Sequence, residues 1–261
     1  MTKSLTCFLV LISFFAHAQK KIASIAVSDK IVFATVDRAG ELYIVTATGQ
    51  IQKFDVSGKL LSVYKNGPTP TLFEPRDGSR LFAFFRNERK IEYLNPAFEV
   101  YDASLIDSAF VIDPWLACAF GDHNILVMDA ADQTLKKINP RTSTVEVDVK
   151  LPDAMASALS DIHYAREYQG FIFLLDRQKG IHIFNGMGRW IKTIPVKLLP
   201  YFNFIGEELY YPKNDSLHLV NLLSGEERQM PLPKPSAITL LTDERLFVIQ
   251  SNSIDFFEFE P

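Results

Sequence analysis

The stretch Glu41-Leu-Tyr-Ile-Val-Thr-Ala-Thr-Gly-Gln-Ile-Gln-Lys-Phe-Asp-Val-Ser-Gly-Lys-Leu-Leu-Ser-Val-Tyr64 contains the pattern on which the rest of the chain is built. An apolar run that starts at Leu42 is followed by a polar turn, a second run that ends at Phe54, a glycine turn and a third run from Leu60. Short apolar runs separated by such turns indicate β-hairpins. The stretch therefore predicts three consecutive antiparallel strands.

The same pattern occurs six times. The second apolar position of each middle strand gives one anchor per unit, and the six anchors are Tyr43, Phe82, Leu126, Phe173, Tyr210 and Phe247. Neighbouring anchors lie 37 to 47 residues apart. A repeat of about 40 residues with four strands is typical of a propeller blade. We therefore predict an all-β fold, a six-bladed β-propeller of four-stranded antiparallel blades.

A second hairpin strand and an innermost strand complete each unit. The partner strands end in an acid or an amide, which in the first five units opens the next turn: Ile51–Asp55, Ile91–Asn95, Leu135–Asn139, Ile181–Asn185, Leu217–Asn221 and Ile254–Glu258. The predicted inner strands precede the anchors: Ile31–Val36, Thr71–Glu74, Trp115–Phe120, Ile162–Ala165, Tyr201–Ile205 and Ala237–Leu241. Asp, Asn and Gly at the turns favour the tight backbone bends that hairpins need.

The sixth unit has three strands before the sequence ends at Pro261. A missing outer strand would leave backbone groups unpaired, which closed propellers avoid. The apolar stretch Lys21–Val27 precedes the first inner strand and has the right composition to fill the place. We predict that this N-terminal strand closes the ring.

The first unit, Leu42 to Leu61, and the fourth, Phe171 to Asn185, resemble repeats of the NHL type, within the wider superfamily of NHL-like and TolB-like propellers. This resemblance implies a six-bladed propeller. It implies no particular activity, because one fold hosts many unrelated functions.

The N-terminus has the features of an export signal. Lys3 precedes an apolar run, and Ala16-His17-Ala18 matches a cleavage site. We expect a signal peptide at residues 1–18 and a single domain at residues 19–261, exported to the periplasm or secreted, with a retained signal-anchor as the alternative. Only Cys118 remains after cleavage, which rules out an intramolecular disulfide.

The net charge of −4 argues against nucleic acid as a partner, because nucleic-acid recognition needs a basic face. The apolar run of the signal is too short to favour a membrane span, and none is expected once the signal has been removed. We expect a monomer whose partner is an envelope protein or a small molecule.

Chain direction groups the turns between second and third strands with the links between blades on one face, here called the upper face. Loops on a rigid scaffold are common binding sites. Cationic residues at these turns, together with one aromatic residue, form a candidate ligand-binding rim: Arg86, Arg89, Lys90, Arg177, Lys179 and Trp115. The competing interpretation is a set of ordinary solvated turns, since Asp129, Asp132 and Asp176 share the rim.

One polar residue on each inner strand gives a second hypothesis. The six are Thr35, Glu74, Cys118, His163, Asn203 and Thr239. If they converge on the channel, Glu74, Cys118, His163 and Asn203 are candidate ligands for a divalent metal. Propeller hydrolases of the lactonase type hold such a metal with carboxylate and amide oxygens. Inner-strand side chains also pack between blades, and no cofactor is expected on that interpretation.

No catalytic motif is present: the chain has no nucleophile elbow, glycine-rich phosphate loop or HExxH sequence. The primary hypothesis is a noncatalytic binding or scaffold propeller of the cell envelope, with its ligand or partner on the upper face or in the channel. The alternatives are a hydrolase or lyase with a channel metal, and a sensor-like domain that binds a small molecule in the channel.

Overall fold

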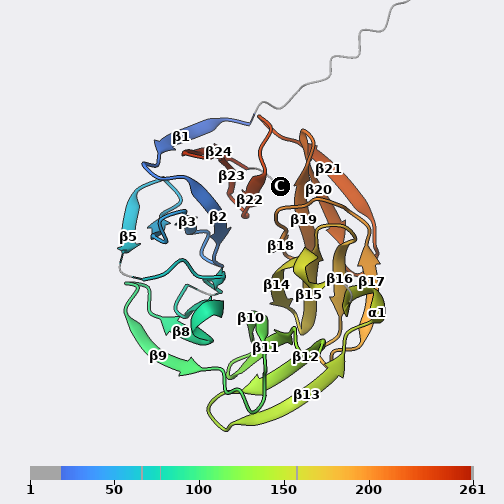
Figure 1. The fold of residues 1–261 in the computed structure, drawn as a ribbon. Helices are drawn as coiled ribbons and strands as arrows, with labels where there is room; N and C mark the ends of the chain where they lie inside the picture. The colour runs from blue at the N-terminus through green and yellow to red at the C-terminus, as the bar shows by residue number, and fades with distance from the viewer. Residues whose placement is uncertain (1–18, 66, 77, 157, 260–261) are drawn as a thin grey trace, which may run out of the picture.

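The computed structural model describes residues 19–65, 67–76, 78–156 and 158–259, and the predicted export signal at 1–18 lies outside them. Six four-stranded antiparallel sheets surround a central axis, with the first strand of each blade innermost (Figure 1). The predicted six-bladed propeller is confirmed.

Five blades follow the chain from the axis outward. Blade one comprises β2 (Ile31–Val36), β3 (Leu42–Thr46), β4 (Ile51–Phe54) and β5 (Leu60–Tyr64), and blade two comprises β6 (Leu72–Glu74), β7 (Leu81–Phe85), β8 (Lys90–Leu94) and β9 (Val100–Leu105). Blade three comprises β10 (Pro114–Phe120), β11 (Asn124–Asp129), β12 (Thr134–Asn139) and β13 (Thr144–Lys150). Blade four comprises β14 (Ile162–Tyr168), β15 (Phe171–Asp176), β16 (Gly180–Phe184) and β17 (Trp190–Ile194), and blade five β18 (Asn203–Ile205), β19 (Glu208–Lys213), β20 (Ser216–Asn221) and β21 (Glu227–Pro231).

The sixth blade joins the two ends of the described chain. Its strands β22 (Ile238–Leu241), β23 (Arg245–Ile249) and β24 (Ser253–Glu258) pair in order, and β1 (Lys21–Ala26) adds to β24 as the outermost strand. The predicted closure by the N-terminal strand is confirmed. Pairing runs from Lys21 opposite Phe257 to Ala26 opposite Ser253.

A carboxylate fastens this closing strand. Asp255 on β24 accepts a hydrogen bond of 2.5 Å from the Ser24 hydroxyl and forms ion pairs with Lys21, at 2.8 Å, and with Lys234. Burial opposes ionisation, but the bonds from Lys21, Lys234 and Ser24 outweigh it and lower the pKa of Asp255 to about 2. The closure therefore combines backbone pairing with a charged clasp.

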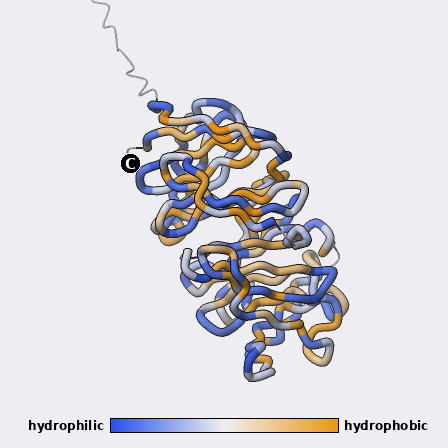
Figure 2. Tube along the Cα trace, turned by 90° about the vertical axis from the view of Figure 1, so that its left-hand side faces the viewer, coloured by the Kyte–Doolittle hydropathy of each residue, from blue (hydrophilic) through white to orange (hydrophobic). Residues whose placement is uncertain are grey.

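The anchor residues form the core. Each of the six is at most 2% exposed, and Figure 2 shows hydrophobic strands with hydrophilic residues gathered at many of the turns. Alternation of side chains along each strand places these apolar residues between neighbouring blades. The predicted repeat anchors are thus confirmed as core positions.

Helical structure is confined to one short α-helix, α1 (Asp153–Ala156), and two 3-10 turns, η1 (Arg86–Glu88) and η2 (Leu159–Asp161), within the described residues. No helix in the described ranges is long and apolar enough to cross a membrane. The upper face carries the links between blades and the turns from second to third strands. The lower face carries the turns from inner to second strands.

Candidate binding site at the lower mouth of the channel

A cavity of about 640 Å³ opens on the lower face where the six inner strands end. Each blade contributes to its lining, represented in order by Asp37, Glu74, Gly121, Arg166, Asn203 and Thr242. We call this cavity the lower mouth. Its volume is within the range of small-molecule sites, about 300–1,000 Å³.

Strand register determines which side chains reach the lower mouth. The inner-strand residues paired with the six anchors are Thr35, Glu74, Cys118, Arg166, Asn203 and Leu240, and of these Glu74, Arg166 and Asn203 line the lower mouth. In blade four this position is Arg166, not the predicted His163, because β14 extends to Tyr168 and pairs Arg166 with Phe173. In blade six it is Leu240, while the predicted Thr239 pairs with Val248.

Glu74 is the buried acid of the lower mouth. Its Oε1 lies 3.8 Å from Arg76 Nε and 3.9 Å from Arg166 Nε, beyond hydrogen-bond distance in both cases. Its Oε2 is buried without a hydrogen-bond partner among the described residues. The residue is 5% exposed, and burial raises the pKa of Glu74 although Arg166 and Arg76 offset part of the rise.

Two donors next to this acid are also unpartnered. Arg166 Nη1 donates to Asn203 Oδ1, but Arg166 Nε and Asn203 Nδ2 make no hydrogen bond of good geometry among the described residues, although the Asn203 side chain also interacts with the Tyr210 hydroxyl. Asn203 is 1% exposed. Because buried polar groups in proteins are usually hydrogen-bonded, three such atoms in one cavity lining need an explanation. One explanation is a bound polar ligand that accepts hydrogen bonds from Arg166 Nε and Asn203 Nδ2 and donates one to Glu74 Oε2.

The wall of the lower mouth is held by arginines between blades. Arg76 donates to Glu167 Oε2 at 2.9 Å and to the Gly121 carbonyl at 2.6 Å, and Arg80 donates to the Asp122 carbonyl at 2.7 Å. These bonds join blades two, three and four at the opening. The charged residues of the lining nearly balance, with four arginines (Arg38, Arg76, Arg80 and Arg166) and five acids (Asp37, Glu74, Asp122, Glu167 and Asp243).

Three aromatic rings fill the channel one layer above these groups. Phe33, Tyr164 and Tyr201 precede Thr35, Arg166 and Asn203 by two positions, and their ring centroids lie 5.2 to 5.9 Å apart. Residues two apart on a strand lie on the same side, so the rings form the next layer of the channel. On their far side, Phe33 and Tyr164 line a separate cavity of about 230 Å³ together with His163.

The predicted metal ligands are therefore divided between two cavities. Glu74 and Asn203 line the lower mouth, whereas His163 lines the upper cavity, where its Nδ1 lies 3.2 Å from the Asp161 carbonyl. Cys118 is fully buried, and burial raises the pKa of its thiol. No group of three or more His, Cys, Asp and Glu residues suited to a metal occurs in the part of the chain that the structure describes.

The predicted cationic rim on the upper face consists largely of side chains with structural contacts. The Arg86 guanidinium lies 3.7 Å from the Trp115 ring centroid, and Trp115 Nε1 donates to the Ile162 carbonyl at 2.7 Å. Lys90 pairs with Glu88 and Glu92, at 2.8 and 2.9 Å.

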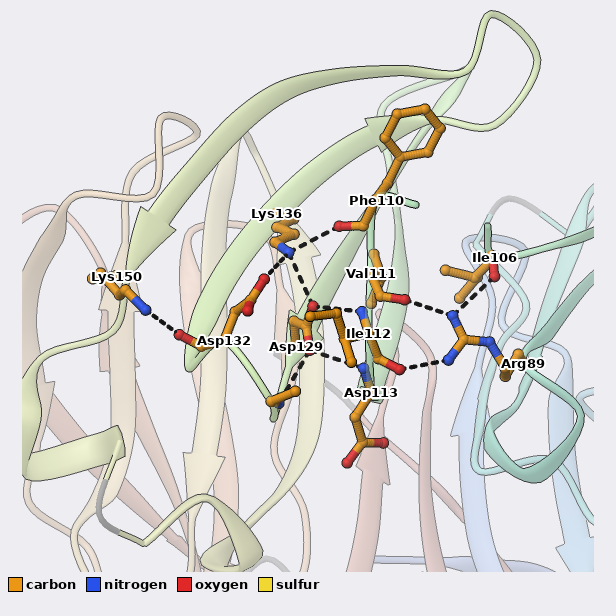
Figure 3. A network of polar contacts seen from close by, with 11 residues as sticks. Arg89, Ile106, Phe110, Val111, Ile112, Asp113, Asp129, Asp132, Lys136 and Lys150 are labelled. Carbon is orange, nitrogen blue, oxygen red and sulfur yellow. Dashed lines mark hydrogen bonds and ion pairs between the residues drawn. The ribbon is translucent and has the colours of Figure 1, made fainter. Parts of the chain in front are cut away.

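Arg89 supports the link between blades two and three, and Lys179 also has a contact within the protein. The Arg89 guanidinium donates to the carbonyls of Ile106, Val111 and Ile112, at 3.2, 2.5 and 2.7 Å (Figure 3). Lys179 donates to the Ala154 carbonyl, and Arg177 is exposed on blade four. The rim cations lie on blades two and four, apart from one another in the repeat.

Blade three, which lies between the blades of these cations, carries the buried carboxylate of Asp129, and its oxygens are fully hydrogen-bonded. Asp129 accepts from the backbone amides of Ile112 and Asp113, at 2.8 and 2.9 Å, and from Lys136 Nζ at 2.9 Å (Figure 3). Lys136 also donates to Asp132 Oδ2 and the Phe110 carbonyl. Burial opposes ionisation of Asp129, but these hydrogen bonds outweigh it and lower its pKa. The network fastens the link between blades two and three.

The sequence prediction does not include Arg166 among the inner-strand residues of the channel. The predicted inner strand of blade four ends at Ala165, which places Arg166 in a turn. The inner-strand residue that pairs with an anchor lies seven or eight positions before it, as Arg166, Asn203 and Glu74 do. This spacing could have identified Arg166 from the sequence. The pairing of Arg166 with Glu74 and Asn203 joins blades two, four and five, and no local pattern encodes it.

No family model and no curated protein sequence matches the chain. Among solved structures, the Pan2 WD40 domain of Neurospora crassa is similar with a TM-score of 0.58 and 10% identity, over 93% of this chain and 96% of that one. A catalytically inactive virginiamycin B lyase of Staphylococcus aureus, crystallised with quinupristin, has a TM-score of 0.53 and 11% identity over 88% and 80% of the two chains.

The extracellular domain of the putative hybrid two-component system BT4673 of B. thetaiotaomicron has a TM-score of 0.52 and 13% identity over 87% of this chain. The chain spans about a third of that structure, 33% of its length. At these identities the similarities show the fold alone, and the number of six blades comes from the strand order of this chain.

Proposed function

We propose that the protein is a noncatalytic binding propeller that holds a small polar ligand in the lower mouth. The observation that carries the proposal is the convergence of three buried, unpartnered polar atoms on one cavity: Glu74 Oε2, Arg166 Nε and Asn203 Nδ2. Unpaired buried groups cost free energy, and a ligand that pairs them recovers that cost. The export pattern at the N-terminus supports the cell envelope as the location of this activity.

The geometry of the lower mouth favours ligand binding over catalysis. Glu74 is flanked by Arg76 and Arg166, and the charged and amide side chains of the lower mouth are accompanied by hydroxyl and apolar ones, without a histidine or a cysteine among the described lining residues. A nucleophile needs an activating base, but the hydroxyls of Tyr168 and Thr242 in this lining bond backbone carbonyls and not a carboxylate. Recognition through hydrogen bonds is the chemistry that these groups support.

A thermal-shift screen of residues 19–261 tests the proposal. Polar small molecules of neutral, zwitterionic, anionic and cationic character are compared on the natural sequence, on Glu74→Gln and on Glu88→Gln. Glu88 is the matched control, because it is a surface glutamate on the upper face whose partner is Lys90.

A ligand at about 100 times its Kd adds about 2.7 kcal/mol, which raises the melting temperature of a domain of this size by about 5–10 °C. We expect at least one compound to stabilise the natural sequence and Glu88→Gln equally and to stabilise Glu74→Gln by about half as much or less, as a tenfold loss of affinity implies. Equal stabilisation of all three proteins, or of none, would contradict the proposal. Stabilisation that disappears with EDTA would favour the alternative of a metal-dependent channel enzyme.

A further inference from the structure

We infer that the ligand of the lower mouth is a neutral saccharide, an inference that rests on the proposed function and narrows its ligand class. Its first basis is the mixture of hydrogen-bonding groups. Glu74 Oε2 can only accept when ionised, whereas Arg166 Nε and Asn203 Nδ2 can only donate. A hydroxyl group both donates and accepts, so neighbouring hydroxyls of one sugar ring satisfy all three atoms.

These groups belong to side chains that lie next to one another. Arg166 Nε lies 3.9 Å from Glu74 Oε1, and Arg166 Nη1 is bonded to Asn203 Oδ1. One guanidinium thus joins the acceptor and the amide donor within a single patch from blades two, four and five. A carboxylate ligand would accept hydrogen bonds from Arg166 Nε and Asn203 Nδ2 but would leave ionised Glu74 without a hydrogen-bond donor. An ammonium ligand would pair Glu74 and leave both donors unpaired.

Charge balance is the second basis. Arg76 is already paired with Glu167 at 2.9 Å, which leaves Glu74 and Arg166 as one negative and one positive group at the base of the cavity. The whole lining, with four arginines and five acids, gives no strong field of either sign. This distribution favours a ligand without net charge over a phosphate or a polyamine.

Aromatic residues in the wall of the lower mouth favour a saccharide over the other ligands without net charge, the zwitterionic amino acids. Tyr168 and Phe204 both line the lower mouth and stack with centroids 4.1 Å apart and planes 1° from parallel. The Tyr168 hydroxyl donates to the Gly206 carbonyl at 2.6 Å, which fixes the ring against the wall. A sugar ring has polar edges and apolar C–H faces, so it can contact an aromatic wall while its hydroxyls reach polar groups around the opening.

The size of the opening agrees with this class. The cavity of about 640 Å³ receives polar residues from every blade, including Asp37, Gln169 and Thr242 around the rim. An amino acid presents its two charged groups on one side. A saccharide presents hydroxyls around its whole edge, which matches a ring of polar groups.

Isothermal titration of residues 19–261 with three compound sets tests the inference: neutral mono- and disaccharides, α-amino acids, and dicarboxylates. We expect at least one saccharide to bind about tenfold or more tightly than any member of the other sets. Glu74→Gln should weaken that saccharide by about tenfold or more, because the variant replaces a hydrogen bond to a charged group, the stronger kind, with one to a neutral amide. Glu88→Gln should leave the affinity unchanged.

A second variant, Tyr168→Phe, separates the ring from its hydroxyl. Tyr168→Phe should keep most of the affinity for the saccharide. Tyr168→Ala should lower that affinity by about fivefold or more, because it removes the aromatic ring. Each variant is compared by its melting temperature, so that a misfolded protein is recognised. Binding of amino acids or dicarboxylates but not saccharides, with loss in Glu74→Gln, would overturn the saccharide inference and leave the proposed function standing. Binding unaffected by Glu74→Gln would overturn both.

Discussion

Asp129 on the upper face and Glu74 in the lower mouth are both buried carboxylates beside a cation, but their surroundings differ. Asp129 accepts hydrogen bonds from three backbone amides, those of Ile112, Asp113 and Ala131, and from the Lys136 ammonium. Glu74 lies between two guanidinium groups and has an oxygen without any donor among the described residues.

The difference distinguishes a carboxylate whose hydrogen bonds support the fold from one that is available to the proposed ligand. The pKa of Asp129 is lowered, because its hydrogen bonds outweigh the cost of burial, whereas burial raises the pKa of Glu74. A perturbed acid in a cavity is a candidate functional group. The same comparison explains why the upper-face cations, which resemble a binding rim in the sequence, are weaker candidates than the residues of the lower mouth.

Replacing Asp129 should have the largest effect on stability. Asp129→Ala leaves the Lys136 ammonium and the backbone amides of Ile112 and Asp113 without their buried acceptor, and breaking such a pair costs about 3–5 kcal/mol. Urea unfolding at neutral pH measures the loss. Asp132→Ala is the control, because Asp132 also bonds Lys136 but is 37% exposed, and it should cost about 1 kcal/mol or less. Equal losses in the two variants would refute the role assigned to Asp129.

Replacing Asp255, which fastens the closing strand, should have the next largest effect on stability. This residue lies outside the lower mouth. With a folded pKa of about 2 against an ordinary value of 3.8, the carboxylate contributes about 2 kcal/mol near neutral pH. A lowered pKa means that this contribution is present above pH 3.8 and is lost as the pH falls toward about 2. Asp255→Asn should therefore be less stable than the natural sequence at neutral pH, with a gap that closes in acid. A gap that persists at about pH 2 would contradict the clasp.

Replacing Glu74 should have the smallest effect on stability, and of the opposite sign. Burial raises its pKa from 4.5, so the ionised carboxylate disfavours folding above the raised pKa and the cost disappears as the pH falls to 4.5. Glu74→Gln should be at least as stable as the natural sequence at neutral pH, within about 1 kcal/mol, and the difference should shrink on acidification. Chemical unfolding across this pH range measures it, with Glu88→Gln for comparison. A loss as large as that of Asp129→Ala would mean that Glu74 serves the fold.

The repeat makes the architecture predictable. Anchors such as Tyr43 and Phe247 recur at blade spacing and face the core, and counting strands in the sequence is enough to assign Lys21–Ala26 to the sixth blade. These features follow from local patterns and from the need to pair every strand edge. They depend little on which residues meet across the channel.

The lower mouth is only partly predictable for the same reason. Glu74 and Asn203 stand out in the sequence as polar exceptions on inner strands, but Arg166 does not, because β14 runs to Tyr168, beyond the predicted end. His163 takes its place in the prediction. Whether a charge has a partner depends on contacts between blades that are distant in the sequence, as the bond from Arg76 to Glu167 shows, and such contacts form only when the blades assemble.

The most direct test of the account is a titration of ¹⁵N-labelled residues 19–261 with the best-stabilising compound from the screen, followed by NMR. The Asn203 side-chain amide, whose Nδ2 makes no hydrogen bond of good geometry among the described residues, gives its own signals. We predict that these signals and the backbone amides of Arg166 and Gly206 shift on binding, while those of Arg86 and Lys90 stay in place. Shifts at Arg86 and Lys90 with an unchanged Asn203 would contradict the lower mouth as the binding site.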